Sequence, residues 1–313
     1  MINEENQAVD GIEQNPLRWL ILAGVWLIYF SFGLTVAAMA PLVPAICSDL
    51  EISYGAMGAV LGVWPFVYIL SALPCGMLLD RIGPRKALFV AAAIMALSGF
   101  LRSFSDTYLI MILAVAVFGL GGPLISIGAP KLIAFLFEGK DRGLAMGIYI
   151  TGPGVGAVVA LSITNSFLLP IFDYSWRSVI GAYALFTISS GCIWLLLSSN
   201  QLGHLVEATM QAASTGPIGE TFRNLASIRS VQIVLAMSVG IFFFNHGLNN
   251  WLPEIIRSKG LSFAEAGYWA AIPTTVSIMS ALLIPRLATA ERRMLVMGLL
   301  IVCAGGATIL LHT

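Results

Sequence analysis

Four polar side chains that could bind a solute lie close together inside one apolar run, residues 231–256. They are Asn245, His246, Asn249 and Asn250. Asparagine offers hydrogen-bond donors and acceptors, and histidine exchanges a proton near neutral pH. On a helix, residues four apart lie one above the other, so the four share two adjoining faces. The pattern predicts contacts with a polar solute or, as the alternative, hydrogen bonds between helices.

Lys131 is a second candidate because it lies in another apolar run, residues 107–137, where a charge is costly. A cation there could attract an anion, and Pro130 just before it could interrupt the helix and free a carbonyl. The alternative is a lysine that extends its ammonium to the membrane surface. Tyr29 and Tyr149, in two further runs, are weaker candidates, because tyrosine also packs or anchors helices.

Enzyme chemistry has no counterpart in the sequence. All 16 carboxylates fall in predicted loops, tails or helix ends. There is neither a phosphate-binding Gly-Lys-Ser motif nor a Ser-His-Asp constellation. The four cysteines are isolated, and the net charge is zero. We therefore expect no enzyme activity, cofactor, metal site or nucleic-acid partner.

The composition predicts an all-α membrane protein. Of the 313 residues, 58% are hydrophobic and 10% charged, and the mean hydropathy is +0.90. A helix needs about 20 apolar residues to cross the hydrocarbon core. Nine runs are long enough: 17–46, 53–79, 87–103, 107–137, 143–170, 177–198, 231–256, 264–287 and 293–311.

The basic residues predict the orientation. With the N-terminus inside, 12 of the 16 lysines and arginines fall on the inner side. The remaining four, on the outer side, are Arg102, Arg177, Arg257 and Lys259. We therefore expect an integral protein of a bacterial or archaeal plasma membrane, with its N-terminus in the cytoplasm.

The runs group into two bundles. We expect a cytoplasmic tail (1–16), a six-helix bundle (17–198), a cytoplasmic linker (199–230) and a partial second bundle (231–313). Pro44, Ile46, Ser53 and Gly58 recur 209 positions later, at Pro253, Ile255, Ser262 and Gly267. This internal repeat predicts six helices in each bundle, whereas the chain supplies six and three. We therefore expect that these 313 residues alone do not complete a transport cycle.

The loop after the second run carries a recognisable motif. It reads Gly76-Met-Leu-Leu-Asp80-Arg81-Ile-Gly83-Pro-Arg85-Lys86. Gly76 suits close helix packing, and Gly83 suits a left-handed turn. The loop resembles the signature G-x-L-x-D-R-x-G-R-[RK] of the major facilitator superfamily, although Pro84 departs from it. The resemblance implies that Asp80 and the surrounding motif form a latch that holds the two bundles together on the inside; the alternative is a basic loop with one solvated acid.

A weaker resemblance narrows the substrate. Trp251-Leu252-Pro253 and the segment from Ala40 to Pro44 resemble the cyanate and nitroimidazole transporter branch of that superfamily. The resemblance implies secondary transport of a small solute by alternating access, with an anion as the favoured solute. The implied partners are this solute, a coupling ion and the lipid bilayer. The alternatives are efflux of drug-like amphiphiles and a fragment or membrane protein that does not transport.

Overall fold

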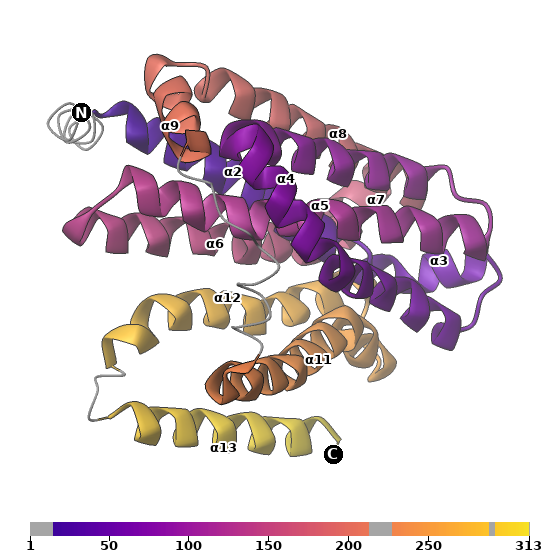
Figure 1. Ribbon diagram of the computed structural model, residues 1–313. Coiled ribbons are helices and arrows are strands. Elements are labelled where there is room, and N and C mark those ends of the chain that lie inside the picture. The colour runs from indigo at the N-terminus through magenta and orange to yellow at the C-terminus, as the bar shows by residue number, and fades with distance from the viewer. Residues whose placement is uncertain (1–14, 213–226, 288–291, 313) are drawn as a thin grey trace, which may run out of the picture.

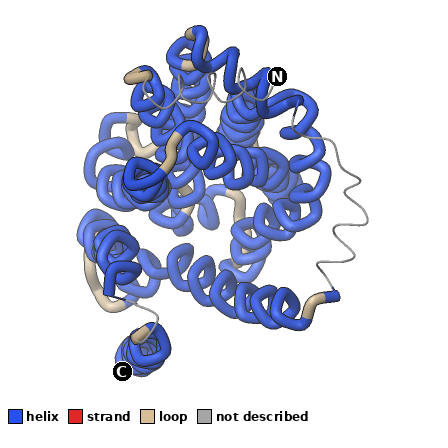
Figure 2. The backbone as a smooth tube through the Cα atoms, turned by 60° about the vertical axis from the view of Figure 1, so that its left-hand side comes forward, coloured by secondary structure: helices blue, strands red, loops and turns tan. Residues whose placement is uncertain are grey.

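The computed structural model describes residues 15–212, 227–287 and 292–312, which form helices joined by short loops (Figures 1 and 2). The prediction of an all-α membrane protein is confirmed. By length and composition, six helices in the described residues can cross a membrane, and the 50-residue α4 holds two of the predicted runs. Together with α12 and α13, these helices correspond to the nine predicted runs.

Residues 17–197 form the first bundle, around one hydrophobic core. Its first span consists of α2 (Leu17–Ala37), the 3₁₀ turn η1 (Ala40–Leu42) and α3 (Val43–Asp49). Pro41 and Pro44 lack the backbone N–H that a continuous helix needs, which accounts for the interruption. The other helices are α4 (Tyr54–Ser103), α5 (Tyr108–Leu136), α6 (Gly139–Ile163), the π-helical η2 (Thr164–Leu168), α7 (Leu169–Ile171) and α8 (Trp176–Leu197).

Local sequence signals set the helix starts. Ser53, Thr107 and Ser175 each accept a hydrogen bond from the backbone N–H three residues later, which satisfies a free donor of the first turn. The expected loop between the second and third runs is instead a kink within α4. Only Gly83 leaves helical geometry there, at φ 79° and ψ 161°. Leu79 and Leu88, on either side of the kink, both face Gly128 of α5.

Glycines bring α2 and α6 into direct contact. A Cβ atom on Gly33 would lie 1.9 Å from the carbonyl oxygen of Pro153, and one on Gly156 would lie 2.1 Å from that of Phe30. No side chain fits at either position, so the two backbones pack against each other. This contact fixes the distance between two helices that carry the candidate site.

Beyond the first bundle, α9 (Gln201–Ala212) is followed by α11 (Arg229–Ser258), α12 (Phe263–Leu287) and α13 (Arg293–His312). In Figures 1 and 2, α13 lies farther from the first bundle than α11 and α12 do. Helix α12 runs along α6: Gly267 faces the carbonyl of Leu161, and Gly154 faces Ile278. Below, "the linker end" is the end of the molecule that carries Leu17 and α9, and "the α3 end" is the opposite end (Figure 1).

Candidate functional site

The first bundle contains five neighbouring aromatic side chains from four helices, which we call the aromatic cluster. They are Tyr29 and Phe32 of α2, Trp64 of α4, Phe118 of α5 and Tyr149 of α6. The Trp64 and Phe118 rings meet edge to face with centroids 5.4 Å apart, and Phe32 stacks on Phe118 at 5.4 Å. The Tyr29 ring meets that of Tyr149 edge to face at 5.3 Å. The cluster therefore combines apolar ring surface with two hydroxyl groups.

The aromatic cluster lies deep in the bundle. Trp64 and Phe118 each come ten residues after the α3 end of their helix. At about 1.5 Å of rise per residue, both lie about 15 Å from that end, half the thickness of a hydrocarbon core of about 30 Å. This depth is where substrates of membrane transporters with paired bundles bind.

The second bundle contributes His246 of α11 to the same place. Its ring meets Trp64 edge to face with centroids 5.1 Å apart, and it stacks on Phe242 at 5.3 Å. The contact joins two residues that lie 182 positions apart in the chain. Of the predicted solute-binding residues, the structure therefore brings Tyr29, Tyr149 and His246 to one site.

The predicted asparagines behave differently. The Asn249 amide donates hydrogen bonds to the side-chain oxygen of Asn245 at 2.8 Å and to its backbone carbonyl at 2.9 Å. This pair lies one turn apart on α11, as the spacing predicted, and Asn250 is half-buried beside it. Asn249 is therefore the donor and Asn245, which remains exposed, the acceptor of a contact within one helix.

Lys131 lies away from the aromatic cluster. Its ammonium is 2.6 Å from a carboxylate oxygen of Asp80, in the signature loop at the linker end. Both side chains are partly exposed, at 41% and 33%. Gly76 shows no close packing here, since an added Cβ would meet Ile127 at an ordinary 4.0 Å. The structure thus assigns Lys131 a carboxylate partner that neither sequence interpretation included.

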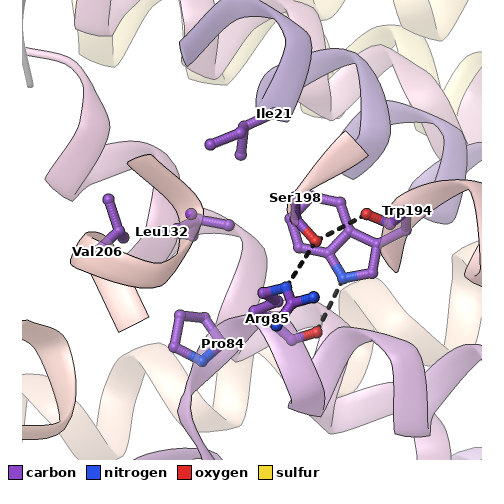
Figure 3. A pocket seen from close by; sticks show the side chains of 8 residues that line it. Ile21, Pro84, Arg85, Leu132, Trp194, Ser198 and Val206 are labelled. Atoms are coloured by element: carbon purple, nitrogen blue, oxygen red, sulfur yellow. Dashed lines mark hydrogen bonds between the residues drawn. The ribbon is translucent and has the colours of Figure 1, made fainter. Parts of the chain in front are cut away.

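The basic pair of the loop fastens the Gly83 kink to α8 and α9, while Arg81 is exposed. Arg85 donates to the hydroxyl of Ser198 at 3.2 Å, and its carbonyl accepts from the Trp194 indole at 2.8 Å (Figure 3). It also donates to the hydroxyl of Ser199 at 2.7 Å. Lys86 and Arg85 also lie 3.6 and 3.9 Å from the buried carboxylate of Glu207 on α9. Arg85, Trp194 and Ser198 line a small pocket at the linker end.

Polar contacts between the bundles gather at the α3 end. The Tyr54 hydroxyl of α4 donates to Glu254 of α11 at 3.1 Å, and Arg257 holds the same carboxylate at 2.8 Å. The Asn165 amide of η2 donates to the carbonyl of Pro41 at 3.1 Å and to that of Phe263, in α12, at 3.3 Å. Asn165 therefore bridges the bundles directly.

A profile of the Major Facilitator Superfamily matches residues 25–313, which is nearly the whole chain. The chain belongs to the major facilitator superfamily. It is thus an integral membrane protein with multiple spans, in a family of transporters rather than enzymes.

Two of the curated relatives of the chain are named as transporters of organic acids. The chain is 27% identical over 242 residues to a probable L-galactonate transporter of Escherichia coli, which covers 73% of this chain and 52% of the relative. It is 25% identical over 293 residues to a gallate transporter of Pseudomonas putida, covering 82% and 63%. The chain therefore spans less than two thirds of these relatives.

The fold is that of solved superfamily structures. A bacterial homologue of the human lysosomal transporter Spinster, in an inward-facing and unoccupied conformation, superposes with a TM-score of 0.63 at 18% identity. The match covers 88% of this chain and 63% of that one. At this identity the likeness establishes the fold alone.

Sequence reasoning missed three members of the aromatic cluster, Phe32, Trp64 and Phe118. Each is an aromatic residue in an apolar run, where packing is the usual role, so type and spacing gave no signal. The available signal was indirect: Trp64 and Phe118 lie at the same depth on helices that follow each other in the chain.

Proposed function

We propose that this chain binds a small organic anion between its two bundles and belongs to a secondary transporter that works by alternating access. The observation that carries the proposal is the contact of His246 with Trp64, which joins the second bundle to the aromatic cluster of the first at mid-depth. Relatives that carry L-galactonate and gallate support an organic anion. The resemblance to the cyanate and nitroimidazole branch also supports an anion.

The chemistry of the aromatic cluster favours a hydroxylated, ring-bearing anion. Trp64 offers ring surface for stacking, with the fully buried Phe118 behind it, while Tyr29 and Tyr149 offer hydroxyls. Histidine can exchange a proton near neutral pH, and His246 lies at this depth in the described part of the second bundle. We therefore propose that the coupling ion is a proton and that His246 binds it. Lys131, the charged residue that the sequence suggested for binding an anion, is instead paired with Asp80.

In this proposal, contacts at the two ends of the molecule open and close the binding site alternately to the two sides of the membrane. We place the N-terminus and the linker end in the cytoplasm, from the distribution of basic residues. The contacts of Tyr54 and Asn165 then close the outer side. When the bundles separate there, Asp80 acts as the latch that holds the cytoplasmic side closed. Ligand affinity that differs between the two states drives the exchange between them.

Equilibrium binding to the purified chain tests the proposal. We expect gallate or L-galactonate to bind. Trp64→Leu should weaken binding about tenfold, since loss of an aromatic contact and its buried area costs roughly 1.4 kcal/mol. The matched control is Trp26→Leu, a tryptophan on α2 whose indole donates to Thr151, outside the aromatic cluster.

Two results would overturn the proposal. One is that amphiphilic cations bind and neither anion does, which would favour efflux of drug-like amphiphiles. The other is that Trp26→Leu weakens anion binding as much as Trp64→Leu does, which would place the site away from the aromatic cluster.

A further inference from the structure

Arg102 is a buried arginine directly behind the aromatic cluster. It lies in the last turn of α4, one residue before the helix ends, and only 3% of it is exposed. Its guanidinium carbon lies 5.3 Å from the ring centre of Phe118, and its Nη1 lies 3.5 Å from the sulfur of Met39. Its Nε has no hydrogen-bond partner among the described residues. The sequence had placed this residue at the outer surface.

Three other arginines near helix ends are paired with carboxylates. Arg177 pairs with Asp49 and Asp106, at the same end of the same bundle, and Arg257 pairs with Glu254. Arg18 pairs with Asp141 at the linker end. Within the described ranges, no carboxylate lies within 4.0 Å of the Arg102 guanidinium. Its contacts are an aromatic ring and a thioether, which leave most of the positive charge uncompensated.

The direction of the side chain is also unusual. An arginine in the last turn of a membrane helix ordinarily extends its guanidinium outward, to the water interface. Arg102 instead reaches Phe118, which lies ten residues, about 15 Å of helix rise, from the start of α5. An uncompensated charge held inside a membrane protein is costly, and such residues are functional candidates by default.

Phe118 connects this charge to the site. The Phe118 ring has Arg102 over it and contacts Trp64 and Phe32 at 5.4 Å each. The charge therefore lies one ring away from the surface that faces His246. In the weakly polarisable interior, a unit charge acts over that distance far more strongly than in water.

We propose that Arg102 is the cation that makes the aromatic cluster select anions, acting through space from behind Phe118 rather than by touching the ligand. This inference rests on the proposed binding of an organic anion and adds the residue that determines specificity for its charge. Arg102 is thus a positioning residue: it sets the electrostatic potential at which the carboxylate binds. Because it is buried, bulk salt screens it little.

A pair of ligands that differ by one carboxylate isolates this role. Gallate carries the carboxylate, and pyrogallol is the same ring without it. We expect Arg102→Met to weaken gallate binding about tenfold or more and to leave pyrogallol binding unchanged, because only the charged ligand senses the lost cation. Arg102→Lys should bind gallate nearly as well as the parent. If L-galactonate is the anion that binds, its neutral partner is galactitol, the open-chain polyol with a hydroxymethyl group in place of the carboxylate.

Arg177→Met is the matched control, since it removes an equal charge at the same end of the bundle from a side chain that is already paired. It should leave both affinities unchanged. Melting temperature is the second readout: replacing an unpaired buried charge with an apolar side chain of similar length should not lower it.

Each other outcome decides against the inference. Equal weakening of gallate and pyrogallol by Arg102→Met would make Arg102 a packing residue. Unchanged gallate binding would remove it from the site. If both Arg102→Met and Arg102→Gln fail to fold while Arg102→Lys folds, its role is structural. If the unaltered chain binds no anion at all, the proposed function itself fails.

Discussion

At the α3 end, polar contacts cross from the first bundle to the second, whereas at the linker end the described ion pairs stay within residues 17–212. Tyr54 and Asn165 reach Glu254 and Phe263 across the boundary. At the opposite end, Asp80 pairs with Lys131 inside the first bundle. The difference indicates a molecule closed at one end, whose latch carboxylate is occupied by a partner within its own bundle.

The comparison also identifies what can move. Contacts that cross the boundary must break when the bundles separate, while the contacts of Arg85 with Ser198 and Ser199 can move with the first bundle as a unit. Such an arrangement is typical of two rigid bodies that rock about a central site.

The largest expected effect concerns which end faces the outside. In a background without the native cysteines, a cysteine replacing Ser258 near the α3 end should react with a membrane-impermeant maleimide added to intact cells. A cysteine replacing Gln201 near the linker end should react only after the cells are opened, because the basic residues place that end in the cytoplasm. The reverse labelling pattern would show that the α3 end faces the cytoplasm.

The next effect concerns the helix contact that holds the α3 end closed. Gly267→Ala adds a methyl group 2.3 Å from the carbonyl oxygen of Leu161, so α12 must move away from α6. We expect a loss of about 1–3 kcal/mol, seen as a lower melting temperature. Gly247→Ala on α11, where nothing lies within 4 Å, is the control and should change little. Equal shifts for both would show that the contact does not hold the bundles together.

The sequence predicted the helices better than the side-chain contacts between them. Apolar runs and the turn at Gly83 set the helices, because membrane insertion demands long apolar segments. His246 was found because a polar residue in an apolar run is conspicuous. Phe32, Trp64 and Phe118 were missed because aromatic residues are unremarkable there. The partner of Lys131 and the inward direction of Arg102 depend on tertiary packing, to which spacing along the chain is blind.

The smallest expected effect concerns the linker end. Asp80→Asn should change stability by less than about 1 kcal/mol, because both members of the Asp80–Lys131 pair are partly exposed. In a form of the protein that transports, it should lower uptake more than expression, since a latch acts on the equilibrium between two states rather than on folding. Parallel losses of uptake and expression would make Asp80 a structural residue only.

Crosslinking between α6 and α12 tests the central claim, that an anion bound between the bundles biases their separation. A Cβ added at Gly154 of α6 would lie 3.9 Å from the Cβ of Ile278 in α12, within the range of a disulfide, so cysteines at both positions can form one in a background without the native cysteines. The account predicts that gallate or L-galactonate raises the rate of this crosslinking about twofold or more, by stabilising the state closed at the α3 end. A rate that is unchanged or lowered at saturating anion would contradict it.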